Sequence, residues 1–411
     1  MSALCNMFRS APICLRWLLL LFAFLGGGMV AQAESLRVMT YNIWVGGRAG
    51  GYPLADTAAV IAAANPDIVG LQEQSGAARQ LAEILEMNVH VTNNDIAYLT
   101  RFPIEGTSAD GIRVRTGLDS HANVFNIHYA AYPYGPYDLR DDPSLTEASL
   151  VATAVATRGA ATTNTLAAMQ IALESGEPTF LLGDFNEPSH LDWTNEAADA
   201  GLHFGATVAW PTSQSIVDAG LTDSFRAVWP DEVSRPAETW TPGYPAPNLS
   251  ADEVHDRIDL IYHAGDGVAA LQAEVVGESL AHADIVVAPY PSDHRAVVVT
   301  FEVPTAGPLP LLGDVNLDGA VNAADASLIQ QHWLQRFDEG NVISYQAGDL
   351  NRDGVVDLFD VNLFQTGLVT YNNTTGGVTV PEPAGWSVML MAWLTVCVAR
   401  GVRRRRHVIW N

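Results

Sequence analysis

The chain has 411 residues, of which 48% are hydrophobic, enough for a large domain with a sizeable core and a smaller second domain. It contains no lysine, and between its arginine-bearing ends 14 Arg stand against 46 Asp and Glu, a net charge of −32. This sign argues against a protein that follows a nucleic-acid backbone by charge, although a metal ion could invert the field locally in a nuclease.

Residues 1–33 have the composition of a secretory signal peptide. Arginines precede the apolar run 17–25, and Ala31-Gln32-Ala33 is a small-x-small cleavage site. An uncleaved anchor is the alternative, but the run is shorter than the roughly 20 residues that a membrane span needs. All three cysteines lie in the end segments, so we expect no disulfide framework between those segments.

The main domain, residues 34–303, begins with alternating strands and helices. Residues 36–44 predict a strand that ends near Asn42, and an alanine-rich helix is expected to follow. Residues 67–73 predict a buried strand that ends in Glu73, before a second helix. Asn42 at a strand end could be a metal ligand or simply a turn former.

A second pair of elements follows in the middle of the domain. Residues 123–129 alternate apolar and polar side chains, which predicts a strand with Asn126 and His128 on one face. A single histidine on a strand is more often a structural residue than a catalyst. Residues 148–175 predict a long helix.

The segment 179–188 contains the most informative motif. Its apolar start is typical of a buried strand, and Gly183 is predicted to allow a turn. If the extended geometry persists, Asp184 and Asn186 point to one side and Phe185 to the other. Asp can accept a proton from water and Asn can donate to a developing oxyanion, so the pair suits hydrolysis. A turn rich in Asx residues is the alternative.

Two later segments add a carboxylate and an imidazole. Residues 256–262 predict a strand with Arg257 and Asp259 on the same side. Asp293 and His294 directly precede the apolar strand expected after them, where a carboxylate from elsewhere in the chain could orient the histidine.

Taken in chain order, these groups resemble the endonuclease/exonuclease/phosphatase superfamily, the fold of pancreatic deoxyribonuclease, neutral sphingomyelinases and inositol-polyphosphate phosphatases. The resemblance implies an α/β fold in which two β-sheets form a sandwich flanked by helices, with the site at one edge. The matching segments are Met39–Trp44, Leu71-Gln72-Glu73, Thr100–Ile104, Asn126-Ile127-His128, Gly183–Asn186, Arg257–Ile261 and Ser292-Asp293-His294.

The resemblance also implies a catalytic metal ion, Mg²⁺ or Mn²⁺. Glu73 would be its principal ligand, with Asn42 beside it and Asp293 contributing. A hard cation of this kind takes few carboxylates and keeps several waters, so the set is chemically reasonable.

Five further residues receive catalytic roles from the resemblance. Asp184 would orient or deprotonate the attacking water, and Asn186 would contact the phosphate. His294 would contact or protonate the phosphoryl group, held by Asp259, and His128 would be a second donor. Attack on phosphorus spreads negative charge over its oxygens, which such donors stabilise.

The sequence leaves the substrate class open among nucleic acid, phospholipid and soluble ester. The aromatic segment from Tyr129 to Tyr137 could form a wall beside the site, and a packed surface loop is the alternative. Arg113 and Arg115 could help to hold a phosphate, but two arginines do not form a basic strip for a duplex backbone.

A proline-rich linker, residues 304–310, precedes an internal repeat in residues 311–370. Residues 313–325 are echoed by 348–360, and oxygen side chains fall at loop positions one, three, five, nine and twelve, with glycine at six. This is the spacing of a calcium loop, although position twelve is Asp where Glu is usual. The tandem resembles a type I dockerin domain.

The dockerin resemblance implies a small all-α domain that binds two Ca²⁺ ions and docks to a cohesin-like protein. A calcium-stabilised spacer without a partner is the alternative. The implied ligands are Asp314, Asn316, Asp318, Asn322, Asp325, Asp349, Asn351, Asp353, Asp357 and Asp360.

Residues 380–411 contain Val380-Pro381-Glu382-Pro383, an apolar stretch and a cluster of four arginines. The stretch is about long enough to span a membrane, with the arginines remaining cytoplasmic. The combination resembles a PEP-CTERM sorting tail of Gram-negative bacteria, which implies export and sorting machinery as partners. A plain membrane anchor is the alternative, and cleavage of the tail stays open.

Together these features predict a secreted or surface-displayed, metal-dependent phosphoesterase, with a phosphodiester as the favoured substrate and water as the attacking group. One alternative is a nuclease that acts on extracellular nucleic acid. The other is a catalytically silent binding or scaffold protein displayed through its dockerin-like module. Metal-dependent turnover separates the silent protein from the two enzymes.

Overall fold

The structure is a computed structural model that describes residues 33–108, 111–117, 120–304, 311–337, 344–351 and 354–375. The predicted sorting tail lies outside these residues, as do the predicted signal peptide apart from its last residue and most of the predicted linker. Within the described segments, no helix is both long enough and apolar enough to span a membrane.

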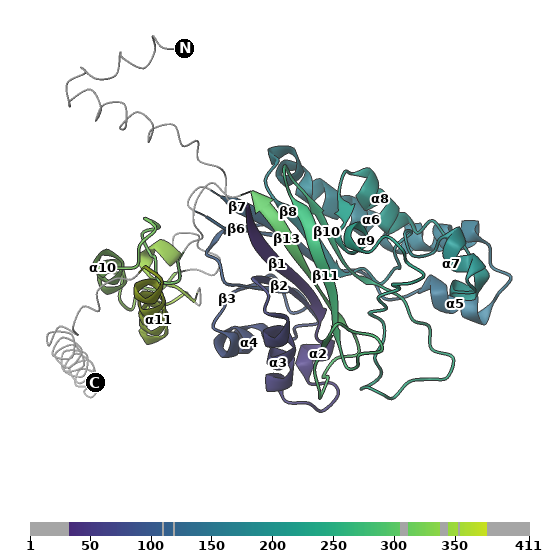
Figure 1. The fold of residues 1–411 in the computed structure, drawn as a ribbon, viewed down its shortest axis with the longest axis horizontal. Coiled ribbons are helices and arrows are strands. Elements are labelled where there is room, and N and C mark those ends of the chain that lie inside the picture. Colours follow the sequence, from purple (N-terminus) through teal and green to yellow (C-terminus); the bar gives the residue numbers. More distant parts are fainter. Residues whose placement is uncertain are drawn as a thin grey trace, which may run out of the picture.

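The larger of two β-sheets contains β1 (Ala33–Asn42), β2 (Ile68–Gln72), β3 (Asn88–Val91), β4 (Ala97–Thr100), β11 (Ala269–Gly277), β12 (Ile285–Val286) and β13 (Ala296–Pro304). Their spatial order is β12-β11-β13-β1-β2-β4-β3. Figure 1 shows β1 and β13 side by side. β1 is central and pairs parallel with β2 and antiparallel with β13. At the start of β1, Ala33 lies opposite Pro304.

The smaller sheet contains β5 (Ile104–Thr107), β6 (Gly111–Arg115), β7 (His121–His128), β8 (Thr179–Asp184), β9 (Thr222–Asp223) and β10 (Asp259–Ala264). Their order is β5-β6-β7-β8-β10-β9. β7 and β8 are parallel, whereas β8 and β10 are antiparallel. The buried, apolar character of β8 agrees with the strand predicted there.

The two sheets pack face to face around a continuous apolar core. Val38 and Phe301 from the larger sheet meet Val124, Phe180 and Leu182 from the smaller one, and all five are almost fully buried. Phe180 and Phe301 have ring centroids 4.8 Å apart. Alternating side chains along each strand supply this inner face and, on the opposite side, the face that the helices cover.

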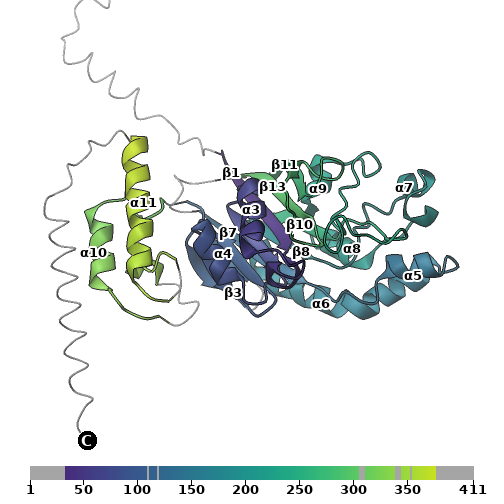
Figure 2. The ribbon, with the colours of Figure 1, turned by 90° about the horizontal axis from the view of Figure 1, so that it is seen from below.

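The helices of this domain are α2 (Trp44–Gly47), α3 (Leu54–Ala64), α4 (Ala78–Leu85), α5 (Gly135–Asp141), α6 (Glu147–Ser175), α7 (Asn195–Asp199), η1 (His203–Gly205), α8 (Pro211–Asp218) and α9 (Ser224–Val228). α3 and α4 cover the outer face of the larger sheet, with Ile61 and Leu81 buried against it. α6 and α8 cover the smaller sheet through Met169 and Ile216 (Figure 2). The predicted sandwich flanked by helices is confirmed.

Gly183 differs from the sequence-based expectation of a turn. β8 continues through Gly183 to Asp184, and Gly183 has φ +152°. A Cβ at this position would lie 2.1 Å from the carbonyl oxygen of Ile127 on β7. The glycine is therefore required for close approach of two paired strands, and the turn begins two residues later.

The described part of residues 311–375 has its own apolar core, which includes Val315, Ile329, Leu350 and Phe364. Its helices are α10 (Ala323–Gln331), η2 (Tyr345–Ala347) and α11 (Leu358–Thr375), so the expected all-α character is confirmed.

The two calcium-type loops fold in the same way around their twelfth residue. Asp325 accepts hydrogen bonds from the backbone N–H groups of Val315, Asn316 and Asn322 at 2.8, 3.0 and 2.9 Å. Asp360 accepts three equivalent bonds from the second loop. The repeat seen in the sequence is therefore a repeat of structure.

The predicted ligands at positions one and nine take defined places. The Asp314 carboxylate accepts from the N–H groups of Asp318 and Gly319 inside the first loop. Asn322 and Asp357 use a side-chain oxygen to accept from the N–H group two residues later, where α10 and α11 begin. Asp353 lies outside the described residues.

Candidate active site

Polar side chains from both sheets meet at one end of the sandwich. Asn42 ends β1, His128 ends β7, Asp184 ends β8 and Asp259 begins β10. The strand register places both His128 and Asp259 directly opposite Asp184. Residues that are far apart in sequence therefore lie at the same end of the sandwich, because strand pairing aligns the ends of neighbouring strands.

A cavity of about 170 Å³ opens at the same end. Its polar lining consists of Glu73, His128, Asp184, Asn186, Asp293 and His294. Asn42 and Asp259 are fully buried and hydrogen-bond to lining residues. All eight residues that the sequence assigned to the catalytic site are thus brought together.

His294 is held between two carboxylates. Its Nδ1 lies 2.8 Å from Asp259 Oδ2, and its Nε2 lies 3.6 Å from Asp184 Oδ2. Burial would lower the pKa of His294, but the charges of Asp259 and Asp184 raise it to about 10. The imidazole is therefore protonated at neutral pH and its Nε2–H can donate.

His128 has a similar arrangement with a carboxylate that sequence reasoning missed. Its Nδ1 lies 3.0 Å from Asp95 Oδ2, and its Nε2 lies 3.5 Å from Asp184 Oδ2. Burial would lower the pKa of His128, but the Asp95 hydrogen bond and the Asp184 charge raise it to about 9. Asp95 also accepts from the Glu73 N–H at 3.0 Å. In sequence, Asp95 looks like one more turn residue after Asn93-Asn94.

Asp184 and Asn186 both line the cavity, but not because the strand continues. Asn186 has φ +49°, a left-handed conformation, and its N–H donates to Asp184 Oδ1 at 2.9 Å. Its side-chain Nδ2 donates to the carbonyl of Tyr129 at 3.1 Å. Phe185 is buried against the rings of Tyr129 and Tyr262. The expected division of sides is correct, whereas the extended geometry assumed for it is wrong.

The residues predicted to hold a metal ion form the other side of the cavity. Asn42 Nδ2 donates to Glu73 Oε1 at 3.3 Å and to Asp184 Oδ2 at 3.0 Å. Glu73 has φ +54°, and such strain in a non-glycine residue is common at functional sites. Asp293 Oδ1 is buried without a hydrogen-bond partner among the described residues.

These residues fit a divalent cation. Burial, together with the charge of Glu73, raises the pKa of Asp293 to about 7, although His294 opposes the shift. A buried carboxylate whose pKa is raised in this way, with an unpartnered oxygen, is stabilised by a bound cation. Oxygen ligands of this type are those that Mg²⁺ and Mn²⁺ prefer.

A different trio, Asp184, Asp259 and His294, also has ligand atoms within 4.8 Å of one another. His294 Nδ1 is bonded to Asp259, and the raised pKa of His294 keeps a proton on Nε2. A protonated imidazole has no lone pair for a metal. The trio therefore fits a hydrogen-bonded relay better than a metal cage.

Aromatic residues complete the lining. Tyr132, Tyr134 and Tyr137 come from the segment for which a wall beside the site was one of two interpretations, and the structure places them in the cavity. Trp240, which sequence reasoning missed, has its ring 4.8 Å from that of His294. Trp240 reaches the site through backbone hydrogen bonds with Asp256, a pairing without a local sequence signal.

The two arginines considered for phosphate binding lie elsewhere. Arg113 pairs with Glu177 at 2.5 Å, and Arg115 pairs with Glu105 at 2.5 Å. Their partners on β7 are Asn123 and His121, so they lie near the opposite end of that strand from His128. That expectation is wrong, because these arginines neutralise local glutamates.

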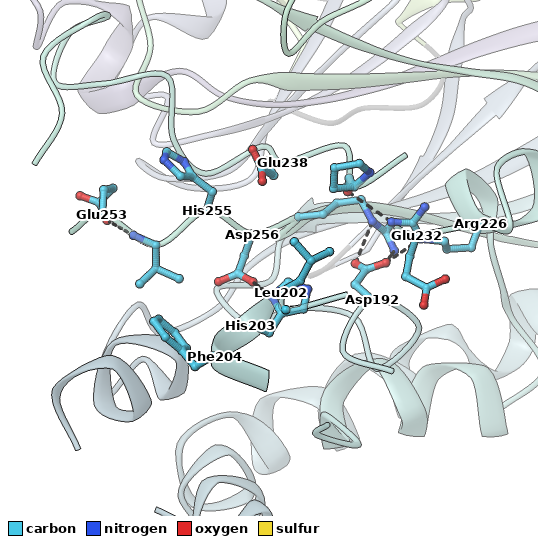
Figure 3. Close-up of a pocket in the computed structure, with 14 residues that line it drawn as sticks. Asp192, Leu202, His203, Phe204, Arg226, Glu232, Glu238, Glu253, His255 and Asp256 are labelled. Atoms are coloured by element: carbon cyan, nitrogen blue, oxygen red, sulfur yellow. Dashed lines mark hydrogen bonds and ion pairs between the residues drawn. The ribbon is translucent and has the colours of Figure 1, made fainter. Parts of the chain in front are cut away.

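Figure 3 shows a second cavity, of about 330 Å³. It is lined by carboxylates, by His203 and His255, and by the guanidinium groups of Arg226 and Arg257. Asp256 lines it and accepts a hydrogen bond at 2.7 Å from Tyr134, which lines the first cavity. The two cavities therefore share a partition.

Comparisons with known proteins agree with this organisation. A model of the endonuclease/exonuclease/phosphatase family matches residues 39–294, and a model of the type I dockerin domain matches residues 312–368. An uncharacterized protein of Caenorhabditis elegans is 32% identical in an alignment of 256 residues that covers 57% of this chain and 80% of the relative.

Three solved structures illustrate the similarity in three dimensions. Truncated TDP2 from Caenorhabditis elegans is 17% identical, with 66% of this chain and 98% of that chain covered and a TM-score of 0.41. An AP endonuclease from Archaeoglobus fulgidus is 16% identical, with 65% and 100% covered and a TM-score of 0.44. The 3′ phosphatase NExo from Neisseria is 20% identical, with 64% and 98% covered and a TM-score of 0.40.

Proposed function

Because the chain belongs to the endonuclease/exonuclease/phosphatase family, we propose that it is a metal-dependent hydrolase of a phosphate ester, with a phosphodiester favoured. The observation that carries the proposal is the position of Asp184, a buried carboxylate that faces the Nε2 atoms of two histidines at 3.5 and 3.6 Å. A proton acceptor between two cationic donors is suited to attack of water on a negatively charged phosphoryl group.

In this proposal Asp184 accepts the proton of the attacking water. The oxygen of that water forms the new bond to phosphorus while the bond to the leaving oxygen breaks. His128 and His294 donate hydrogen bonds to the phosphoryl oxygens as negative charge grows on them. Asp95 and Asp259 keep these imidazoles oriented and protonated through their Nδ1 atoms.

Glu73 and Asp293, with Asn42 beside them, would hold the metal ion. Mg²⁺ is the ion we propose, and when bound it neutralises phosphoryl charge and polarises the ester toward attack. Asn186 would contact the phosphate, and the support for this role is that Asn186 and Asp184 line the same cavity.

The test is a set of parallel assays on the full chain with Mg²⁺. The substrates are bis-p-nitrophenyl phosphate, p-nitrophenyl phosphate, plasmid DNA and sphingomyelin. We expect turnover of at least one of them that Glu73→Ala abolishes, while Glu83→Ala, an exposed carboxylate on α4, serves as the matched control. Turnover that is identical in both variants, or that persists with chelator, would contradict a metal-dependent mechanism at this site.

We also propose that the dockerin domain binds two Ca²⁺ ions and docks to a cohesin-like protein. The support is the matched pair of loops closed by Asp325 and Asp360. Addition of EGTA to the full chain should lower its helical circular dichroism signal, and Ca²⁺ should restore it. A chain with both Asp325→Ala and Asp360→Ala should not respond; an unchanged parent spectrum would refute calcium-dependent folding.

Export is a further part of the proposal and rests on the sequence of the two ends. Residues 1–33 would direct secretion, and residues 380–411 would direct sorting to the surface or release by a Gram-negative bacterium. Deletion of residues 1–33 should retain the chain in the cytoplasm. Surface delivery of the deleted form would overturn this assignment.

A further inference from the structure

We propose that the active site takes a small phosphate ester whose non-leaving group is planar and aromatic, in preference to polymeric nucleic acid. The inference rests on the proposed phosphoesterase function and deepens it. Three features support it: a continuous set of aromatic rings beside the catalytic histidines, the direction of their polar atoms, and the sign of the charge around them.

The rings form one connected wall from the catalytic centre outwards. Trp240 lies against His294, and its ring centroid is 5.5 Å from that of Tyr244. Trp240 is also joined to Tyr137, whose ring lies 5.0 Å from that of Tyr134 in an edge-to-face arrangement. Edge and face contacts of this kind suit a flat ring inserted beside them.

The polar atoms of this wall are occupied on the side away from the substrate. Tyr134 donates its hydroxyl hydrogen to Asp256 at 2.7 Å, and Tyr137 donates to Glu253 at 2.5 Å. The indole N–H of Trp240 donates to the Tyr137 oxygen at 3.0 Å. The wall therefore presents ring carbons to the cavity and few polar atoms, which favours an apolar, flat substrate group over a phosphate or a sugar.

Tyr132 stands at the mouth of the same cavity. Its side chain is 70% exposed, which is unusual for a large aromatic residue, and it lines the cavity with the other rings. An exposed ring beside a buried catalytic centre provides a stacking surface for a group that enters from solvent.

The charges around the site disfavour a polyanion. Among the described residues that line the cavity, the basic side chains are those of His128 and His294, and no arginine is among them. The second cavity, whose residue Asp256 accepts from Tyr134 of the wall, presents Glu232, Glu238 and Glu253 (Figure 3). A polymer would place its flanking phosphates in this negative field, whereas a small ester brings one phosphate to the two imidazoles.

The guanidinium groups of the second cavity do not reverse this field, because carboxylates already hold them. Arg257 bonds to Asp192 and Asp223 with four contacts of 2.8 to 3.2 Å, and Arg226 bonds to Asp192 at 2.6 Å. Both arginines are almost fully buried. They are thus structural groups and are not aimed at a ligand.

The experiment compares two esters that share a leaving group and differ in the group that stays on phosphorus. The probes are bis-p-nitrophenyl phosphate and methyl p-nitrophenyl phosphate, with the full chain and Mg²⁺. The ratio of their kcat/KM values is measured for the parent, Tyr132→Ala and Tyr132→Phe, so that intrinsic reactivity cancels between proteins. Phe204→Ala, an exposed aromatic of the second cavity, is the matched control.

We expect Tyr132→Ala to lower the ratio by about tenfold, the scale of one lost stacking contact, mainly through KM for the aromatic ester. Tyr132→Phe should keep the parent ratio because the ring is retained, and Phe204→Ala should keep it as well. An equal ratio in parent and Tyr132→Ala would overturn the inference while leaving the phosphoesterase proposal intact. Failure of the parent to hydrolyse either ester would overturn the inference, and failure on all four substrates of the first assay as well would overturn the phosphoesterase proposal.

Two further assays ask whether the aromatic group is a nucleobase or an aryl ring, and whether the site also accepts a nucleic-acid polymer. Thymidine 5′-(p-nitrophenyl phosphate) carries a nucleobase, and a preference for it over bis-p-nitrophenyl phosphate would assign the wall to nucleotides; the reverse would assign it to aryl esters. For a single-stranded oligonucleotide, added NaCl should raise kcat/KM by screening repulsion. A steep fall with salt, as for a cationic nucleic-acid binder, would overturn the inference.

Discussion

Two buried clusters of charged side chains in the same domain use similar residue types in different ways. The active-site cluster consists of His128, Asp184, Asp259 and His294. The other, which we call the arginine cluster, consists of Asp192, Asp223, Arg226 and Arg257. In both clusters, carboxylates lie within hydrogen-bonding or ion-pair distance of nitrogen cations.

The difference lies in the cation and in the unused oxygens. In the arginine cluster, each oxygen of Asp192 and Asp223 has at least one donor, and guanidinium does not lose its proton. In the active-site cluster the cations are imidazoles, which exchange protons, and Asp259 Oδ1 has no partner among the described residues. Burial therefore does not separate the two clusters. The active-site cluster differs from the structural arginine cluster in having cations that exchange protons and a carboxylate oxygen without a donor.

The largest expected effect breaks the active-site cluster without changing its shape. Asp184→Asn removes the proton acceptor, and we expect turnover of bis-p-nitrophenyl phosphate to fall about 10³-fold. The carboxamide keeps one oxygen for the Asn186 N–H, but its NH₂ group would face the Asn42 Nδ2 donor, so the melting temperature should also fall and turnover is compared per folded molecule. Turnover within a factor of two of the parent, in folded protein, would contradict the role given to Asp184.

The next prediction concerns a substitution in the arginine cluster, which should lower stability and leave activity unchanged. Arg257→Met leaves Asp192 and Asp223 without their main counter-charge, so we expect the free energy of unfolding to fall by about 3 kcal/mol. Activity per folded molecule should be retained at low temperature. Arg235→Met, which removes an exposed ion pair with Asp284, is the matched control and should cost less than about 1 kcal/mol.

A smaller effect tests the carboxylate that orients His128. Asp95→Asn keeps an acceptor for the Glu73 N–H but removes the negative charge beside Nδ1, so turnover should fall about tenfold. The pKa of His128 should drop from about 9, and the protonated donor would then be lost as pH rises. The loss should therefore be larger at pH 8.5 than at pH 6.5; a uniform loss would indicate a structural role alone.

The smallest effect concerns acid stability. Burial would raise the pKa of Asp223, but Arg257 holds it below its ordinary value of 3.8. Below that value the unfolded chain binds more protons than the folded one, so stability from this ion pair is lost as pH falls. Denaturant unfolding between pH 5 and pH 3 should show a shallower loss for Asp223→Asn than for the parent. Parallel curves would show that other carboxylates dominate.

The fold was predictable from the sequence, and the eight residues that the family resemblance named lie together at one end of the sandwich, several of them at strand ends. Asn42, His128 and Asp184 each end a strand whose apolar pattern is local, and the shared end follows from pairing. The calcium-type loops were predictable for the same reason, since each is contiguous in sequence. In both cases the sequence pattern lies within the same short segment as the strand or loop that it predicts.

The residues that were missed reach the site through contacts with distant segments. Asp95 follows an unremarkable turn, and only the approach of β4 to β7 brings it to His128. Trp240 depends on its pairing with Asp256. Gly183 was assigned to a turn because glycine permits one, whereas its actual constraint is the carbonyl of Ile127 on a neighbouring strand. Contacts between segments that are distant in sequence leave no periodic pattern in the sequence from which they could be predicted.

The pairing of Ala33 with Pro304 fixes the orientation in which this enzyme can be tethered. β1 has ten residues; it begins beside the last residue of β13 and ends at Asn42 in the site, a length of roughly 30 Å. Anything joined to either end of the domain therefore leaves from one point, opposite the catalytic mouth. A support attached at these two domain ends would therefore lie at the far end of β1 from the cavity.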